Sequence, residues 1–381
     1  MGVLSGLRIV EMAGIGPAPF AGMMLADHGA EVLCIDRLAP SGLGIPAAEP
    51  ELDPLGRGKR SVALDLQKPT GAAAALDLIV RADAVIEGFR PGVMERLGLG
   101  PDPCLQRNPK LVYGRMTGFG QTGPLRDRAG HDIDYIALTG VLDAIGPAGH
   151  KPVPPLNLVG DFGGGGMMLA FGVVAALLNV QRGGQGQVVD AAMTEGASLL
   201  GAMFHGLAAM GLWDRARGGN LLDGGAPFYD TYETADGKFI AIGAIEPKFY
   251  AELLRGLGLD PDTLPEQMDR ARWPALKASI AAAVKRRSQA AWVVAFDGTD
   301  ACVQPVLSFA DAAGHPHNRA RDSFVQAHGL TQPAPAPRFM ATPGAIGRAP
   351  PAPGADTASA LADWGLPPAV LAALRSAGAV P

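Results

Sequence analysis

Four side chains in this sequence are of the types that can take up and release protons. His131 is followed directly by Asp132, and an imidazole titrates near neutral pH, where proton transfer is most effective. Asp161 precedes the glycine run Gly163–Gly166, and Glu246 ends an apolar segment just before a proline. Each residue also has a purely structural interpretation, because Asp and His can cap helices and a lone Glu can be a solvated acid. The spacing alone leaves both interpretations open.

The glycines after Asp161 add a property that a helix cap does not need. A backbone without Cβ atoms lets another molecule approach closely. Backbone N–H groups at a helix start can also stabilise negative charge that develops during a reaction. Gly163 and Gly164 are therefore candidate donors to an anionic oxygen.

Basic side chains gather where the predicted strands of the N-terminal third begin or end. Ligands of open α/β sheets bind outside the carboxyl ends of the strands, and cations collected there can hold phosphates. Exposed loops are often charged for solubility alone, so this alternative stays open. The residues concerned are Arg37, Arg57, Lys59, Arg60, Arg90 and Arg96.

Two other motifs indicate little. Gly14-x-Gly16, with Asp36 after the next strand, approaches a dinucleotide fingerprint, but Pro19 stands where the third glycine belongs. We interpret it as a tight turn. His315-x-His317 has no third ligand at matching spacing, so no metal site is predicted.

Composition narrows the function classes. The 381 residues are 48% hydrophobic and 18% charged, which is typical of a globular chain with a large core. A net charge of −5 argues against a nucleic-acid binder. Three widely spaced cysteines predict no disulfide framework and a cytoplasmic location. The longest uncharged run, 162–180, contains four consecutive glycines and indicates a buried helix rather than a membrane span. The N-terminus predicts a core strand rather than a secretory signal.

The elements that must position these residues alternate between strand and helix in the first 120 positions, which predicts a parallel sheet covered by helices. The predicted strands cover 7–10, 32–35, 61–66, 84–86, 111–116 and 188–189. Residues 231–234 and 239–243 flank Ala-Asp-Gly and predict a hairpin. Later helices are predicted over 164–181, 191–213, 247–257, 273–296 and 357–375, with a proline-rich strap at 331–353.

These patterns predict three parts of the chain. Residues 1–223 form a large α/β domain, 224–325 a smaller α+β domain, and 326–381 a strap and helix that return to the large domain.

Long segments in order carry a resemblance to one family. They include MAGIGPAPFAGMMLADHGAEV, GRGKRSVALDL, AGHDIDY, PPLNLVGDFGGGG and LDGGAPFYDTYETADGKFIAIGAIEP. From about Leu4 to Phe339 the chain resembles the α-methylacyl-CoA racemases, within the family III CoA-transferase group. The Gly-His-Asp-Ile segment marks the racemase branch. Gly56 departs from the pattern, because the group more often has Asn there.

The resemblance implies a fold and a site. The fold has a large domain with a Rossmann-like parallel sheet, a small α+β domain, and two chains interlocked as a homodimer whose sites form between the domains of different chains. His131 and Asp161 are implied as the two catalytic bases, with Glu246 contacting Asp161 and Asp132 supporting His131. Arg37, Arg60, Arg90 and Arg96 match the loops of the family that contact coenzyme A.

The implied reaction inverts a 2-methylacyl-CoA thioester at its α-carbon through an enolate. One base removes the proton from one face, and the other returns a proton to the opposite face. Asp161 has to carry a proton to return one, so its pKa has to be raised. The like charge of Glu246 is the candidate cause of this rise. The N–H groups of Gly163 and Gly164 would face the enolate oxygen. No metal or redox cofactor is expected, and coenzyme A enters as part of the substrate.

Two alternatives remain at this point. Transferases of the same group use the counterpart of Asp161 as a nucleophile that forms an acyl anhydride. A non-catalytic acyl-CoA binding protein is the other, although the reactive positions are intact.

Overall fold

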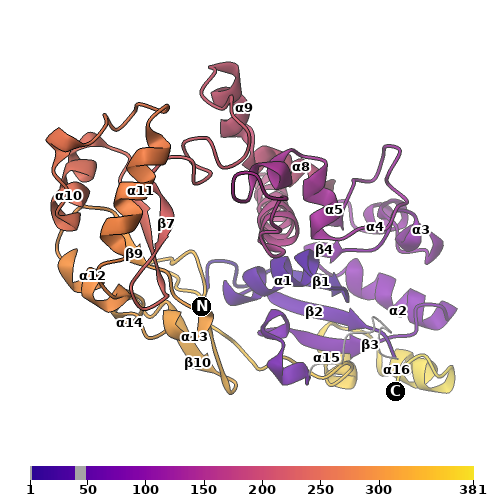
Figure 1. Cartoon of the computed structure of the whole chain (residues 1–381). Coiled ribbons are helices and arrows are strands. Elements are labelled where there is room, and N and C mark those ends of the chain that lie inside the picture. The colour runs from indigo at the N-terminus through magenta and orange to yellow at the C-terminus, as the bar shows by residue number, and fades with distance from the viewer. Residues whose placement is uncertain (1, 39–48) are drawn as a thin grey trace. The chain divides into compact units, whose positions relative to one another are not determined.

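The chain folds into two compact units, the second of which interrupts the first in sequence. This computed structural model describes residues 2–38 and 49–381. Unit 1 comprises residues 1–139, 156–200 and 316–381, and unit 2 comprises residues 140–155 and 201–315. Figure 1 shows the elements of both units. The sequence analysis predicted different boundaries, after residues 223 and 325. That division into three domains remains a prediction.

A six-stranded sheet forms the centre of unit 1. Every neighbouring pair of its strands is parallel, in the order β3-β2-β1-β4-β5-β6. This is the order of a Rossmann-like sheet, as predicted, and it reverses direction between β1 and β4. The strands are β1 (Arg8–Met12), β2 (Glu31–Asp36), β3 (Arg60–Ala63), β4 (Ala84–Glu87), β5 (Val112–Thr117) and β6 (Val188–Ala192).

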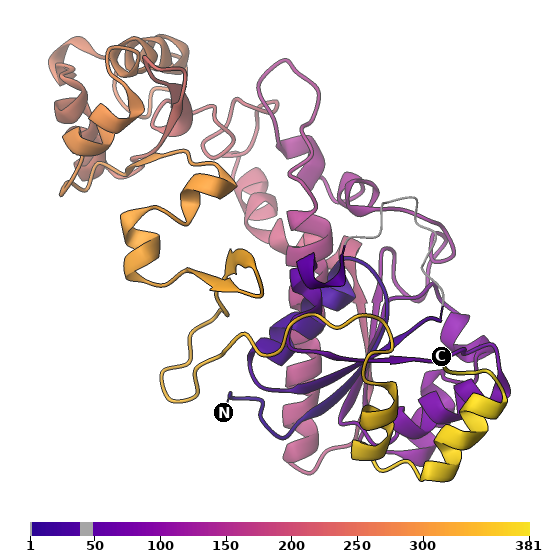
Figure 2. The ribbon, with the colours of Figure 1, turned by 90° about the horizontal axis from the view of Figure 1, so that it is seen from below.

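Alternate residues of these strands bury themselves on opposite faces of the sheet. Val10 and Leu33 belong to one apolar cluster, whereas Ile9 and Val32 belong to another. Helices therefore have to cover both faces. In Figure 2 the long helix α7 lies on one side of the sheet and the yellow C-terminal helices on the other. The helices of unit 1 up to position 137 are α1 (Pro17–Asp27), α2 (Pro69–Ile79), α3 (Val93–Arg96), α4 (Pro101–Arg107) and α5 (Asp132–Ala137), with the short turns η1 (Pro50–Leu52) and η2 (Pro54–Gly56).

The predicted apolar helix after Asp161 is continuous in the structure, but it changes from π-helical to α-helical along its length. A wide π-helical segment, η3 (Leu158–Gly166), leads into α7 (Met167–Gln181). The stretch is long and apolar enough to cross a membrane. However, Leu169 and Val173 are fully buried and pack against Gly114 of β5, which is the packing of a core helix. Helix α8 (Met193–Leu200) then packs against η3.

Unit 2 is built on a three-stranded antiparallel sheet in the order β7-β8-β9, made of β7 (Tyr229–Glu233), β8 (Phe239–Gly243) and β9 (Val303–Pro305). The predicted hairpin is the β7–β8 pair. One face of this sheet carries the core of the unit, in which Phe228, Ile240 and Trp292 are fully buried. Its helices are α6 (Val141–Ala144), α9 (Ala202–Ala209), α10 (Pro247–Leu257), η4 (Pro261–Thr263), α11 (Trp273–Val284), α12 (Gln289–Ala295) and α13 (Phe309–Ala312).

The C-terminal segment belongs to unit 1. It contains α14 (Pro316–Ala320), the antiparallel pair β10 (Phe324–Ala327) and β11 (Leu330–Pro333), α15 (Thr357–Asp363) and α16 (Pro368–Ser376). Leu361 and Trp364 are buried in the same cluster as Val10. The strap is anchored by Arg57, whose guanidinium binds Asp27 at 2.6 Å and also Gln332 at 2.7 Å. The tail therefore completes one side of the sheet.

Candidate active site

His131 stands at the start of α5, on the exposed side of unit 1. Its backbone is extended, and its N–H donates to the Asp134 carboxylate at 2.9 Å. This bond fixes the turn in which the chain enters the helix. His131 is thus exposed to solvent at the start of the helix.

Asp132 connects the segment of His131 to the segment of Asp161. Its side chain is buried, and its Oδ2 accepts a hydrogen bond of 2.7 Å from the backbone N–H of Asp161. Gly160 makes room for this contact, because a Cβ there would lie 2.5 Å from the same oxygen. The sequence analysis expected Asp132 to support His131. The structure gives its carboxylate a bond to Asp161 instead, and support of His131 stays a prediction.

The Asp161 carboxyl group lies in η3 in a half-buried environment that favours its protonated form. Burial raises its pKa most, and the nearby Asp132 charge raises it further. The amide of Asn157, which donates to Oδ2 at 3.1 Å, and the charge of His131 lower the pKa but do not cancel the rise. A carboxyl group of this kind is suited to both taking and giving a proton.

Asn157 and Gly16 are site neighbours that the sequence analysis did not single out for this role. Asn157 precedes Asp161 by four residues, a spacing that places both on one side of a helical turn. Gly16 has a φ of 69° at the start of α1, and a Cβ there would lie 3.2 Å from Asp161 Oδ2. The turn that we predicted at Gly14-x-Gly16 therefore faces the Asp161 carboxylate.

Gly163 and Gly164 lie inside the π-helical segment η3. Hydrogen bonds in such a segment join residues five apart, and the Met167 N–H accordingly donates to Phe162 O. Gly164 also packs directly on α8, since a Cβ there would lie 2.5 Å from the Ala197 nitrogen. Close helix packing is thus one physical reason for this glycine. Their predicted role as donors to an enolate oxygen remains untested.

Glu246 belongs to unit 2, where it begins α10 with its side chain exposed. The Gln267 amide fixes the approach to it, with bonds of 3.2 Å to Ala244 O and 2.8 Å to Ile245 O. Burial raises the pKa of the Cys302 thiol, and the charge of Glu246 adds to this rise. The expected contact between Glu246 and Asp161 stays a prediction.

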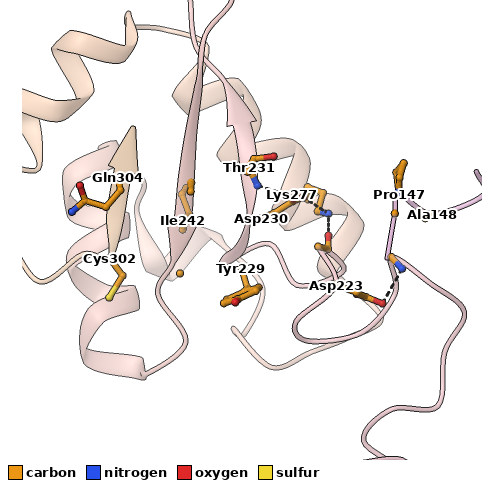
Figure 3. A pocket seen from close by; sticks show the side chains of 15 residues that line it. Pro147, Ala148, Asp223, Tyr229, Asp230, Thr231, Ile242, Lys277, Cys302 and Gln304 are labelled. Atoms are coloured by element: carbon orange, nitrogen blue, oxygen red, sulfur yellow. Dashed lines mark hydrogen bonds and ion pairs between the residues drawn. The ribbon is translucent and has the colours of Figure 1, made fainter. Parts of the chain in front are cut away.

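A pocket of about 740 Å³ lies in unit 2 beside the strands β7 and β8. Figure 3 shows Tyr229 and Thr231 of β7, Gln304 of β9 and the adjacent Cys302 on this pocket. Lys277 lines it as well, in an ion pair of 2.7 Å with Asp230. This pocket was not predicted from the sequence. Its formation depends on the pairing of β9 with β8, which lies some sixty residues earlier in the chain.

The predicted coenzyme A arginines fall into two groups. Arg37 follows β2, and Arg90 and Arg96 follow β4, at the carboxyl ends of strands on either side of β1. Over the part of the chain that the structure describes, these three guanidinium groups form no ion pair of 4.0 Å or less. Their role in binding coenzyme A stays a prediction.

Arg60 is placed differently, at the amino-terminal end of β3. Its guanidinium binds Asp363 at 2.9 Å and Glu31 at 3.6 Å, so it helps to hold α15 against the sheet. Lys59 beside it is buried in an ion pair with Glu11 at 2.7 Å. The role of Arg60 in binding coenzyme A stays a prediction, and its present partners account for it structurally.

Comparison with known proteins identifies the family. The model of CoA-transferase family III matches residues 4–357, and the chain belongs to this family. The α-methylacyl-CoA racemase of Mus musculus is 52% identical over 342 residues, which cover 90% of this chain and 87% of that protein. The Homo sapiens α-methylacyl-CoA racemase is 48% identical over 341 residues, or 89% and 87% of the two chains. A crystal structure of a CAIB/BAIF family protein from Brucella suis matches with a TM-score of 0.82 at 25% identity, covering 95% of this chain and 99% of that one.

Proposed function

We propose that this protein is an isomerase that interconverts the (R) and (S) forms of 2-methylacyl-CoA thioesters. The similarity to two α-methylacyl-CoA racemases over about nine-tenths of the chain supports the reaction class. The observation that carries the proposal is the Asp132 bond, which joins the segments of His131 and Asp161 in one unit. Burial, and to a smaller degree the charge of Asp132, raises the pKa of Asp161.

The reaction needs two groups that exchange roles. Neutral His131 takes the α-proton of one enantiomer, and protonated Asp161 returns a proton to the opposite face of the planar enolate. In the reverse direction the Asp161 carboxylate is the base and the imidazolium is the acid. Burial and the charge of Asp132 raise the pKa of Asp161. The protonated form of this carboxyl group therefore lies closer in free energy to its ionised form at neutral pH. In this proposal Glu246 adds a further like charge, the N–H groups of Gly163 and Gly164 face the enolate oxygen, and no metal or redox cofactor takes part.

Coenzyme A binding follows from the sheet topology. Ligands of doubly wound sheets bind outside the carboxyl ends of the strands at the point where the strand order reverses, here between β1 and β4. Arg37, Arg90 and Arg96 flank this point and supply charge for phosphates. Asp161 is adjacent to the same edge through its contact with Gly16, which follows β1. The thioester would thus extend from the phosphates toward the two bases.

The working form in this proposal is a cytoplasmic homodimer. One side of α7 leaves Met167, Phe171, Val174 and Leu178 exposed at helical spacing. An apolar stripe of this length on a core helix is the type of surface that a second subunit covers. The cysteines are free thiols, which suits a reducing compartment.

A CoA-transferase is the second candidate, because the chain belongs to a family named for that activity and retains Asp161. In that reaction the Asp161 carboxylate attacks the thioester, coenzyme A leaves, and the acyl anhydride formed then needs a carboxylate acceptor. A racemase needs no acceptor.

The test is to incubate each purified enantiomer of a 2-methylacyl-CoA with the enzyme and to follow both by chiral chromatography. We expect each enantiomer to give a mixture of both without a carboxylic acid present. Replacing His131 with Ala should reduce this rate by about 10² or more, the usual contribution of a general base. Turnover that depends on an added carboxylate, survives His131→Ala and converts Asp161 to its hydroxamate when hydroxylamine is present would establish the transferase instead.

A further inference from the structure

Arg115 of β5 is held between two carboxylates that come from either end of the segment after β4. Its Nε donates to Glu87 Oε1 at 2.9 Å, while Nη1 and Nη2 donate to the two oxygens of Glu95 at 2.7 and 3.3 Å. Arg115 and Glu87 are buried, whereas the Glu95 side chain is 45% exposed. The fork of the guanidinium thus fixes the distance between the end of β4 and helix α3.

Both carboxylates sit beside residues that the proposed function assigns to coenzyme A. Glu87 Oε2 accepts the N–H of Phe89 at 2.7 Å, which shapes the turn leading to Arg90. The Phe89 ring in turn carries the Arg37 guanidinium at 6.0 Å from its centroid. At the other end Glu95 precedes Arg96.

The turn between these two ends bends sharply. Gly92 has a φ of 80° and begins α3, and a Cβ there would lie 3.3 Å from Arg96 Nη1. The Arg96 side chain therefore folds back over the turn. Met94 is buried in the core and anchors the middle of this segment, while the polar bonds at its two ends hold the flanking arginines in place.

We propose that Arg115 is a positioning residue for coenzyme A: it clamps Glu87 to Glu95 and so holds Arg90 and Arg96 where the phosphates bind. The proposal rests on the proposed function for the identity of the ligand. Arg115 does not itself meet the ligand, because its donors are directed at the two glutamates. The charges also match this role, since hydrogen bonding to Arg115 lowers the pKa of Glu95.

The test uses Glu95, because replacing buried Arg115 would leave Glu87 unpaired and risk the fold. Glu95→Ala removes both bonds to Arg115 and keeps a good helix former in α3. Glu95→Gln restores one neutral bond. The matched control is Asp77→Ala in α2, since Asp77 is 33% exposed and pairs with Arg107 at 2.8 Å. Calorimetry with coenzyme A itself measures the affinity, and steady-state kinetics on a 2-methylacyl-CoA separate KM from kcat.

Glu95→Ala is expected to weaken coenzyme A binding about tenfold, the effect of losing roughly one good phosphate contact, with a parallel rise in KM and a kcat changed less than about twofold. Glu95→Gln should fall between it and the wild type, and Asp77→Ala should match the wild type. Equal coenzyme A affinity of Glu95→Ala and wild type, or a lower kcat at unchanged KM, would overturn the proposal. If the wild type binds coenzyme A and Glu95→Ala does not, but neither racemises, the positioning role stands and the proposed function fails.

Discussion

The Oδ2 atom of Asp132 accepts a 2.7 Å hydrogen bond from the backbone N–H of Asp161. One buried carboxylate therefore both places the segment of the second base and raises its pKa. The residue next to His131 thus contacts the segment of Asp161, which lies 29 residues further along the chain.

Asp132→Asn should separate these two effects. The amide oxygen can still accept the Asp161 N–H, so the fold should persist, but the negative charge that raises the pKa of Asp161 is lost. The pKa of Asp161 should fall, and the limb of the pH profile of kcat/KM that it controls should move to lower pH. We expect a loss of roughly tenfold to a hundredfold in kcat at neutral pH. An unmoved limb with a normal rate would exclude the coupling.

Gly16→Ala tests the space beside the second base. The position has a φ of 69°, and the new methyl group would press on Asp161 Oδ2 from 3.2 Å. Strain of about 1–2 kcal/mol and displacement of the carboxylate should lower kcat more than stability. Gly183→Ala, also at positive φ (91°) but with no atom within 4 Å of the new Cβ, is the control for backbone strain alone. Comparable kcat values for the two variants would contradict the assignment.

Glu11 makes the stability of unit 1 depend on pH. Burial, opposed by Lys59, raises its pKa from 4.5 to about 7. Between these values the folded state binds more protons than the unfolded state at this residue, so its contribution to stability falls as the pH rises from about 4.5 to about 7. Glu11→Gln should flatten the pH dependence of the free energy of unfolding in this range, measured by urea denaturation at successive pH values. A slope identical to that of the wild type would show that Glu11 does not titrate there.

Phe171→Glu tests the homodimer. Phe171 is 73% exposed in the apolar stripe of α7, and a buried unpaired carboxylate at an interface is costly. We expect the wild type to be dimeric by light scattering and the variant to be largely monomeric. Val294→Glu, at a 77% exposed apolar position of α12, is the matched control and should leave the mass unchanged. A wild-type monomer would count against the stripe as an interface.

The sequence patterns located most of the fold. Alternation of strand and helix predicted the parallel sheet, and the predicted helix over 247–257 has the same bounds in the structure. Long helical patterns were predicted too long: 191–213, 273–296 and 357–375 each break into two helices. The breaks fall where the chain turns, as at Gly365 with a φ of 79°. In the α15–α16 pair the apolar pattern continues across the break because both helices face one core.

The sequence singled out candidate site residues but not their partners in the structure. His131, Asp161 and Glu246 stand out by type and by resemblance. The bond from Asp132 spans 29 residues, and Arg60 pairs with Asp363 across the whole unit. Such partners depend on how distant segments pack, which local spacing does not encode. Asn157 carried a weak local signal in its spacing of four from Asp161.

The central claim is that His131 and Asp161 exchange protons with one carbon from opposite faces. It is tested most directly by incubating each enantiomer of a 2-methylacyl-CoA in deuterium oxide and following the α-proton by NMR, with no second substrate. We expect deuterium from the solvent to replace the α-proton of either enantiomer. Both enantiomers should appear in the labelled product. Retention of the α-proton by active enzyme would contradict it.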